Sequence, residues 1–98
     1  MPPRLRLNPE AEADLVEAFA WYEGQRPGLG SEFFAEVAQV LQRIEDAPLQ
    51  HAVVQEDTRR AIVRRFPYAV FFIVDPDVIA VTAVMHGKRD PKRWQMRR

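Results

Sequence analysis

The chain has 98 residues, of which 47% are hydrophobic and 29% charged, and its formal net charge at pH 7 is zero. This length suits one domain, residues 1–98, with a core that buries roughly 60–70% of the unfolded surface. The absence of cysteine excludes disulfides, thiolate metal sites and a cysteine nucleophile. The longest apolar run, residues 69–74, is too short to span a membrane, and the N-terminus lacks an apolar signal region, so a cytoplasmic protein is expected.

The charge is unevenly distributed along the chain. Residues 1–58 carry four basic and eleven acidic side chains, whereas residues 59–98 carry ten basic and three acidic ones, which gives formal charges of −7 and +7. A cationic surface on a small sheet usually faces an anionic partner, either nucleic acid or an acidic protein segment. The alternative is that the two halves neutralise each other within the fold.

The N-terminal part predicts a short strand and then a helix. Residues 4–7 alternate polar and apolar side chains with the period of a strand. Asn8-Pro9 is typical of a helix start, so a helix should begin here and run to about Gly24. This helix should bury Trp21 and Tyr22 and leave a solvated acidic face formed by Glu10, Asp14 and Glu17.

A second helix should follow a glycine-rich turn at residues 24–30. It should run from Leu29 or Ser31 to Asp46, with an apolar stripe formed by Phe33, Val37, Leu41 and Ile44. Because the connection is short, the two helices should form an antiparallel hairpin.

The remaining chain predicts a sheet. Residues 49–58 are expected to be irregular and residues 90–98 to form a basic C-terminal tail or short helix. Strands are expected over residues 61–65, 69–74 and 78–85, with a break at Phe66-Pro67-Tyr68 and a tight turn at Asp75-Pro76-Asp77. The predicted order is strand, helix, helix, strand, strand, strand. This is an α+β fold in which a helical hairpin packs on one face of a small antiparallel sheet.

The strand at residues 69–74 is apolar on both faces, although two helices can cover only one face of such a sheet. Val70, Phe72 and Val74 lie on one face, and Ala69, Phe71 and Ile73 on the other. An uncovered apolar face usually marks a protein-binding surface, so a partner segment or a second copy of the chain should lie across it. The alternative is that the C-terminal tail folds over this second face.

His86 is the candidate for general acid–base chemistry. It ends the last predicted strand beside Lys88 and Arg89, whose cations could stabilise charge on a phosphate. The alternative is a histidine that merely ends the strand. No metal-ligand spacing and no phosphate-binding glycine loop is present, so neither a metal nor a cofactor is expected.

Basic residues around the strands are candidates for binding a partner. Guanidinium groups bind phosphates and carboxylates alike, so residue type does not separate nucleic acid from an acidic protein. Trp94 is the aromatic residue of the basic tail that could stack on a base. The binding candidates are Arg60, Arg64, Arg65, Lys88, Arg89, Arg93 and Trp94.

Several motifs occur in order over nearly the whole chain, from about residue 4 to residue 94. The helical part carries Ala13-Asp14-Leu15, Trp21-Tyr22 and Pro27-Gly28-Leu29-Gly30, followed by Phe33 and Val37. The most specific motifs are Arg64-Arg65-Phe66-Pro67-Tyr68 and His86-Gly87-Lys88-Arg89-Asp90-Pro91 with Trp94. Together they make the chain resemble the RelE/ParE superfamily of toxins from bacterial type II toxin–antitoxin systems.

The resemblance implies an acidic or amphipathic antitoxin wrapped around the toxin. RelE-like members cleave messenger RNA on the ribosome, whereas ParE-like members poison DNA gyrase. Arg60 and Arg89 match basic positions of the nuclease branch. Ile62 and Ala69, however, stand where that branch has a catalytic lysine and arginine, and Trp94-Gln95 replaces its C-terminal tyrosine. Alkyl groups cannot stabilise phosphate charge, and indole cannot act as a phenolic acid.

This pattern favours the ParE branch: a toxin that inhibits gyrase by binding, is not an enzyme, and is neutralised by a cognate antitoxin. The alternative is a RelE-like, ribosome-dependent messenger RNA endonuclease in which His86, Arg65 and Arg89 are catalytic. A further alternative is a member that has lost its toxicity. The expected assemblies are a homodimer or a toxin–antitoxin hetero-oligomer, with no membrane partner.

Overall fold

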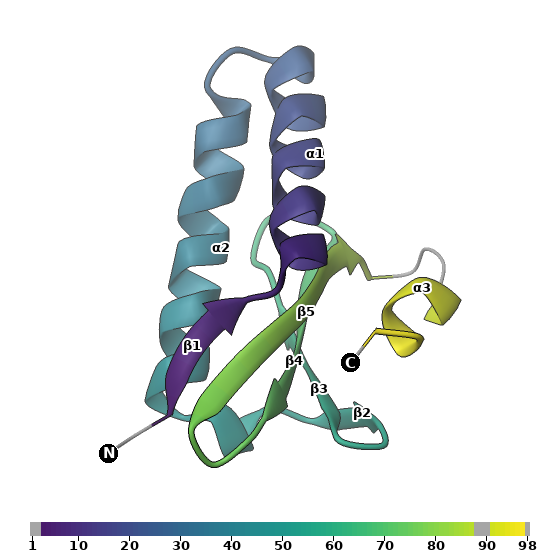
Figure 1. Cartoon of the computed structure of the whole chain (residues 1–98). Helices are drawn as coiled ribbons and strands as arrows, with labels where there is room; N and C mark the ends of the chain where they lie inside the picture. The colour runs from purple at the N-terminus through teal and green to yellow at the C-terminus, as the bar shows by residue number, and fades with distance from the viewer. Residues whose placement is uncertain (1–2, 88–90, 98) are drawn as a thin grey trace.

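The computed structural model describes residues 3–87 and 91–97. Its elements in chain order are β1 (Arg4–Leu7), α1 (Pro9–Gln25), α2 (Leu29–Asp46), the 3-10 turn η1 (Pro48–Gln50), β2 (Val53–Gln55), β3 (Thr58–Ile62), β4 (Tyr68–Val74), β5 (Val78–His86) and α3 (Pro91–Gln95). Figure 1 shows α1 and α2 side by side as a hairpin on the sheet, with α3 on the other side. The α+β class and the helical hairpin are confirmed.

The five strands form one sheet in the order β1-β5-β4-β3-β2. β2, β3, β4 and β5 pair antiparallel with their neighbours, but β1 pairs parallel with β5, with Leu5 opposite Ile79. The sheet is therefore mixed and mostly antiparallel. A parallel pair needs a long crossover connection, and the helical hairpin supplies part of it.

Two strand predictions were wrong. β3 lies at Thr58–Ile62, not at residues 61–65, because the chain turns after Ile62 and the Val63 amide donates to the Tyr68 carbonyl at 2.9 Å. Arg65 sits inside this turn with a left-handed φ of 71°. The region expected to be irregular contains η1 and β2, whose pairing with β3 is interrupted by a register shift.

The main core lies between the helical hairpin and one face of the sheet. Phe33, Val37 and Ile44 of α2 and Ala11, Ala18 and Tyr22 of α1 meet Val70, Phe72, Ile79 and Val81 there. Trp21 does not join them. It is 60% exposed and lines an open pocket between α1 and the end of β5 instead.

The second face of the sheet is covered by the chain itself. Ala69, Phe71 and Ala83 are fully buried there, and Trp94 of α3 is 7% exposed and closes over them. The expectation of an uncovered apolar face is therefore wrong, and the alternative of a C-terminal tail folded over it is confirmed. The physical reason is that the indole of Trp94 stacks on the Phe71 ring and packs with Ala69, Ala83 and Met85.

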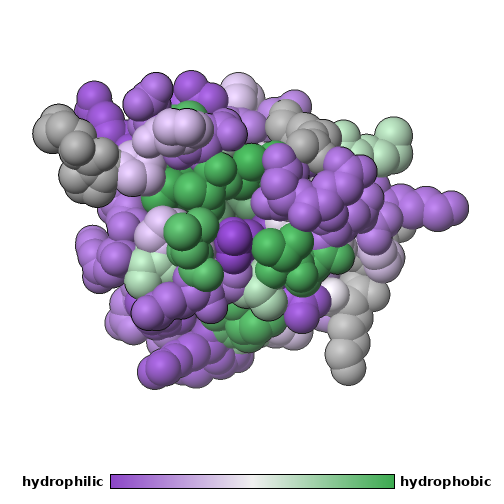
Figure 2. All heavy atoms as spheres, turned by 90° about the horizontal axis from the view of Figure 1, so that it is seen from below, coloured by the Kyte–Doolittle hydropathy of each residue, from purple (hydrophilic) through white to green (hydrophobic). Residues whose placement is uncertain are grey.

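Some apolar side chains do reach the surface at the end of the molecule that carries η1 and β2. Leu49 of η1 is 67% exposed and Val53 of β2 is 48% exposed. Figure 2 shows apolar side chains gathered on this end, with hydrophilic ones around them. Within the described parts of the chain, no helix is long and apolar enough to cross a membrane.

The turn between α1 and α2 is held by one carboxylate. Glu23 accepts the backbone N–H groups of Gly28 and Gly30, each at 2.9 Å, and so satisfies free amides at the start of α2. Gly28 has a φ of 90°, which favours glycine. Gly30 packs directly against the Phe19 ring, so the hairpin closes at this point.

Replacing Gly30 by alanine should destabilise the protein by about 1–3 kcal/mol. A Cβ there would lie 2.8 Å from two ring atoms of Phe19 and 2.9 Å from a Glu23 carboxylate oxygen. Gly24→Ala is the matched control, because a Cβ at Gly24 meets nothing within 4 Å. It should stabilise the protein by about 0.5–1 kcal/mol. Urea unfolding of both variants measures this, and equal effects would contradict the packing argument.

Candidate functional site

The basic residues singled out in the sequence occupy different environments. Arg60 on β3 and Arg64 in the turn after it are exposed, and Arg93 is exposed on α3. Lys88 and Arg89 lie outside the described residues. The described candidates therefore do not form one continuous patch. Arg60 lies on the second face of the sheet and Arg93 on α3, which packs on that face, whereas Arg65 turns toward α2.

Arg65 is held by two acids of α2. Its guanidinium lies 2.7 Å from Glu32 and 3.7 Å from Glu36, and its Cζ lies 5.5 Å from the centre of the Phe66 ring. Arg26 approaches the same Glu32 carboxylate at 3.1 Å. The hydrogen bond from Arg65, followed by that from Arg26, lowers the pKa of Glu32, and the hydrogen bond from Glu32 raises the pKa of Arg65. Here the acidic and basic halves of the chain neutralise each other, as one alternative expected.

This cluster predicts a pH-dependent stability. Because the folded-state pKa of Glu32 is below its usual 4.5, its contribution is complete above about pH 5 and is lost as the pH falls through the lowered pKa. Glu32→Gln should therefore be less stable than the parent at pH 7 and nearly equal to it at about pH 2–3. Urea unfolding at both pH values measures the difference. A difference that stays constant with pH would contradict the assignment.

The second face of the sheet carries the positions that decide between the two toxin branches. Ile62 lies directly opposite Ala69, and Ala69 lies opposite Met85, so these three side chains form one row across β3, β4 and β5. Arg60 lies opposite Phe71 in the neighbouring row. Trp94 stacks on Phe71 with ring centroids 4.3 Å apart and an interplanar angle of 12°.

Trp94 was predicted to be able to stack on a base, but it is 7% exposed and its ring is stacked on Phe71. Its ring is used inside the fold, because Phe71 offers a flat apolar surface at the centre of the sheet. Among the described residues, the row of Ile62, Ala69 and Met85 carries alkyl and thioether side chains, with Arg60 in the neighbouring row.

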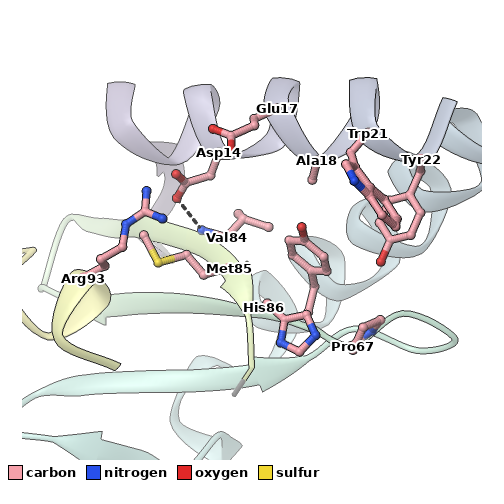
Figure 3. Close-up of a pocket in the computed structure, with 11 residues that line it drawn as sticks. Asp14, Glu17, Ala18, Trp21, Tyr22, Pro67, Val84, Met85, His86 and Arg93 are labelled. Atoms are coloured by element: carbon pink, nitrogen blue, oxygen red, sulfur yellow. Dashed lines mark hydrogen bonds between the residues drawn. The ribbon is translucent and has the colours of Figure 1, made fainter. Parts of the chain in front are cut away.

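A pocket of about 270 Å³ lies between α1 and the end of β5. Figure 3 shows Asp14, Glu17 and Trp21 of α1 on one side of it, with His86 and Arg93 on the other. The His86 ring is 5.9 Å from that of Tyr68, which also lines the pocket. Of the candidate residues, His86 and Arg93 thus line the same pocket, whereas the ion pairs of Arg65 run to α2.

Asp14 of this pocket was wrongly predicted to lie on a solvated face of α1. Its side chain is 9% exposed, not solvated, and it pairs with Arg97 at 2.6 Å. The same carboxylate accepts the backbone N–H of Val84 at 3.0 Å (Figure 3). The available signal was helical spacing, since Asp14 lies between the buried Ala11 and Ala18 on one face of α1.

A second hollow, of about 450 Å³, lies on the outside of the helical hairpin. It is almost entirely apolar and is lined by Leu15 of α1 and by Phe34, Ala38 and Leu41 of α2, among others. Phe34 is 41% exposed and Val16, on the neighbouring surface of α1, is 65% exposed. Among the described residues, no group of three or more His, Cys, Asp or Glu side chains could hold a metal ion.

Comparison with known proteins identifies the class. Residues 5–91 match the family model described as the ParE toxin of type II toxin–antitoxin system, parDE. The chain is 33% identical over 92 residues to Toxin ParE2 of two Mycobacterium tuberculosis strains, CDC 1551 / Oshkosh and H37Rv, covering 93% of this chain and 88% of the relative.

A solved structure has the same fold. The chromosomal ParDE TA system from P. aeruginosa contains a chain that superposes with a TM-score of 0.78 at 17% identity, covering 87% of this chain and 96% of that one. The chain therefore belongs to the ParE family of toxins from type II toxin–antitoxin systems.

Proposed function

We propose that this ParE-family chain inhibits DNA gyrase by binding it and that a cognate antitoxin neutralises it. The observation that carries the proposal is the row Ile62, Ala69 and Met85 on the second face of the sheet, next to Trp94. Cleavage of a phosphodiester needs a proton acceptor and cations near the developing charge. Alkyl groups at these positions supply neither, so a toxin with this face acts through contact.

The antitoxin is proposed to use the apolar hollow on the outside of the helical hairpin. An amphipathic helix can place apolar side chains at intervals of three and four residues into such a groove. Leu15, Phe34 and Leu41 provide the apolar walls, and the small Ala35 and Ala38 leave room between them. This surface is separate from the exposed Arg60 and Arg64, which remain available for the target.

A second candidate function is ribosome-dependent cleavage of messenger RNA. The observation that favours it is that His86 and Arg93 both line this pocket. The imidazole could act as a base, and a guanidinium lining the same pocket could stabilise phosphate charge. In this reading His86 is the catalytic base.

Two assays on the purified chain separate these functions. A gyrase supercoiling assay should show loss of supercoiling with accumulation of cleaved DNA–gyrase complexes, and a ribosomal transcript-cleavage assay should leave transcripts intact. Arg60→Glu with Arg64→Glu should weaken gyrase inhibition by about tenfold or more, since opposite charges guide such encounters. Arg4→Glu, an exposed change on β1, is the matched control and should have little effect.

Transcript cleavage that is abolished by His86→Ala would instead establish the enzyme.

The antitoxin proposal is tested by co-expression with a small acidic protein encoded next to the toxin, which should restore growth. Ala38→Lys in the toxin should prevent this rescue without changing gyrase inhibition. Rescue that is unaffected by Ala38→Lys would place the antitoxin elsewhere.

A further inference from the structure

The C-terminal segment, residues 91–97, covers an apolar surface that is separate from the main core. Phe71, Ala83 and Met85 cluster with Trp94 on the second face of the sheet, whereas the helical hairpin packs on the opposite face. The ladders of β3, β4 and β5 are made among the strands themselves. Opening of the segment would therefore leave the sheet and the main core in place, as a local rather than a global transition.

Two side chains attach this segment, and they make different kinds of contact. Trp94 stacks flat on Phe71. Three residues later, Arg97 donates to both carboxylate oxygens of Asp14, at 2.6 and 3.4 Å, and to the Thr82 carbonyl at 3.3 Å. The surface under the segment thus combines the apolar ring of Phe71 with the Asp14 carboxylate and the Thr82 carbonyl. It receives an aromatic ring and, three residues later, a guanidinium group.

The segment has little else to hold it in a helical form. α3 has five residues, far fewer than an isolated helix needs to be stable in water. Pro91, Lys92 and Arg93 are exposed, and the Arg97 side chain keeps 20% of its surface in water. Ile62, in the row next to Phe71 on the same face, remains 59% exposed. A longer helix could cover Ile62, which α3 leaves in water.

We propose that this face of the sheet is an interaction surface that the free chain occupies with its own segment 91–97. In its place the surface accepts a helical turn of a partner protein that carries an aromatic residue followed three residues later by an arginine. The aromatic ring of the partner stacks on Phe71, and its guanidinium pairs with Asp14. The proposal is independent of whether the toxin acts on gyrase or on messenger RNA.

A displacement experiment in the full chain tests this surface. In Trp21→Phe, Trp94 is the remaining one of two tryptophans, so its emission reports the segment alone. The probe is a peptide of residues 91–98 with Trp94→Phe, which does not emit. Adding Arg97→Gln to the protein weakens its own segment but leaves Asp14 and Phe71 intact. Binding of the peptide should then shift the Trp94 emission of the Arg97→Gln protein to the red, and the shift should saturate. The peptide should bind this protein about tenfold or more tightly than it binds the protein that keeps Arg97. The reason is that an intact tethered segment competes with the peptide at an effective concentration of about 1 mM or more.

Controls distinguish site occupancy from unfolding or simple charge attraction. The same peptide carrying Arg97→Gln should bind about tenfold more weakly, because it lacks the partner for Asp14. A protein with Lys92→Gln, which changes the charge equally, should behave like the chain with Arg97. In the Arg97→Gln protein, hydrogen exchange should accelerate at the Val84 amide but not at the Phe72 amide. If Arg97→Gln does not fold, Arg97→Lys replaces it.

Three results would overturn the proposal. These are the absence of a saturable emission shift, equal binding of the two peptides, and exchange that accelerates equally at Val84 and Phe72. The first two would show that the surface does not select an aromatic residue with an arginine. The third would show that the segment opens only when the whole chain unfolds.

Discussion

Phe33→Ala is expected to lower the free energy of unfolding by about 4 kcal/mol, and the melting temperature by roughly 15–30 °C. Phe33 is fully buried, and its ring centre lies 5.1 Å from those of Tyr22 and Tyr68 and 5.2 Å from that of Phe66. Truncation would leave a cavity among three rings that cannot all move into it, because each is fixed to a different element. Urea unfolding monitored by far-UV circular dichroism measures the loss.

Phe34→Ala is the control for this prediction. The two phenylalanines are adjacent, but Phe34 points to the outside of the hairpin, is 41% exposed and packs on Phe19 at 4.6 Å between ring centres. Its removal should cost about 1–2 kcal/mol. Equal losses for the two variants would show that the main core is not centred on Phe33. Phe34→Ala should also weaken antitoxin binding, since Phe34 lines the outer hollow.

Asp14→Ala is expected to lower the free energy of unfolding by about 2–3 kcal/mol. It removes the acceptor for the Val84 amide and the partner of Arg97 at once. The loss should stay below that for a completely buried ion pair, because the Arg97 side chain is 20% exposed and can turn to water. Thermal and urea unfolding measure it.

Glu17→Ala is the matched control, since Glu17 lies on the same helix but is exposed. It should change stability by about 0.5 kcal/mol or less. A double-mutant cycle with Arg97→Ala should give a coupling energy of about 1–2 kcal/mol with Asp14 and close to zero with Glu17. Coupling that is absent for Asp14 would mean that the ion pair does not hold the C-terminal segment in solution.

Local patterns in the sequence predicted much of the fold. Asn8-Pro9 and the apolar stripe of α2 predicted both helices, and the second was predicted to end at Asp46, as it does. The turn residues after Val74 predicted the β4–β5 hairpin. These features depend on capping, turn chemistry and the period of apolar residues, all of which act over a few neighbouring positions. The motifs around Pro67 and Gly87 also predicted the family, which the comparisons confirmed.

Apart from the local errors at β2, β3 and Trp21, the errors concern contacts between residues far apart in the chain. The parallel pairing of β1 with β5 joins residues more than seventy positions apart, such as Leu5 and Ile79. Asp14 looked like part of a solvated face because its partner, Arg97, lies at the other end of the chain. The ion pairs of Arg65 with Glu32 and Glu36 were likewise not indicated by the sequence, and its role in binding a partner stays a prediction.

The composition and local order of the chain therefore determined its two helices, its β4–β5 hairpin, its family and its division of charge. Tertiary structure alone decided which acidic and basic side chains pair and which segment covers the second apolar face of the sheet. Side-chain periodicity indicates which face of an element is apolar, but it carries no information on which distant segment will cover that face. Trp94 illustrates the difference: its sequence neighbours are basic and exposed, and only folding places its ring on Phe71.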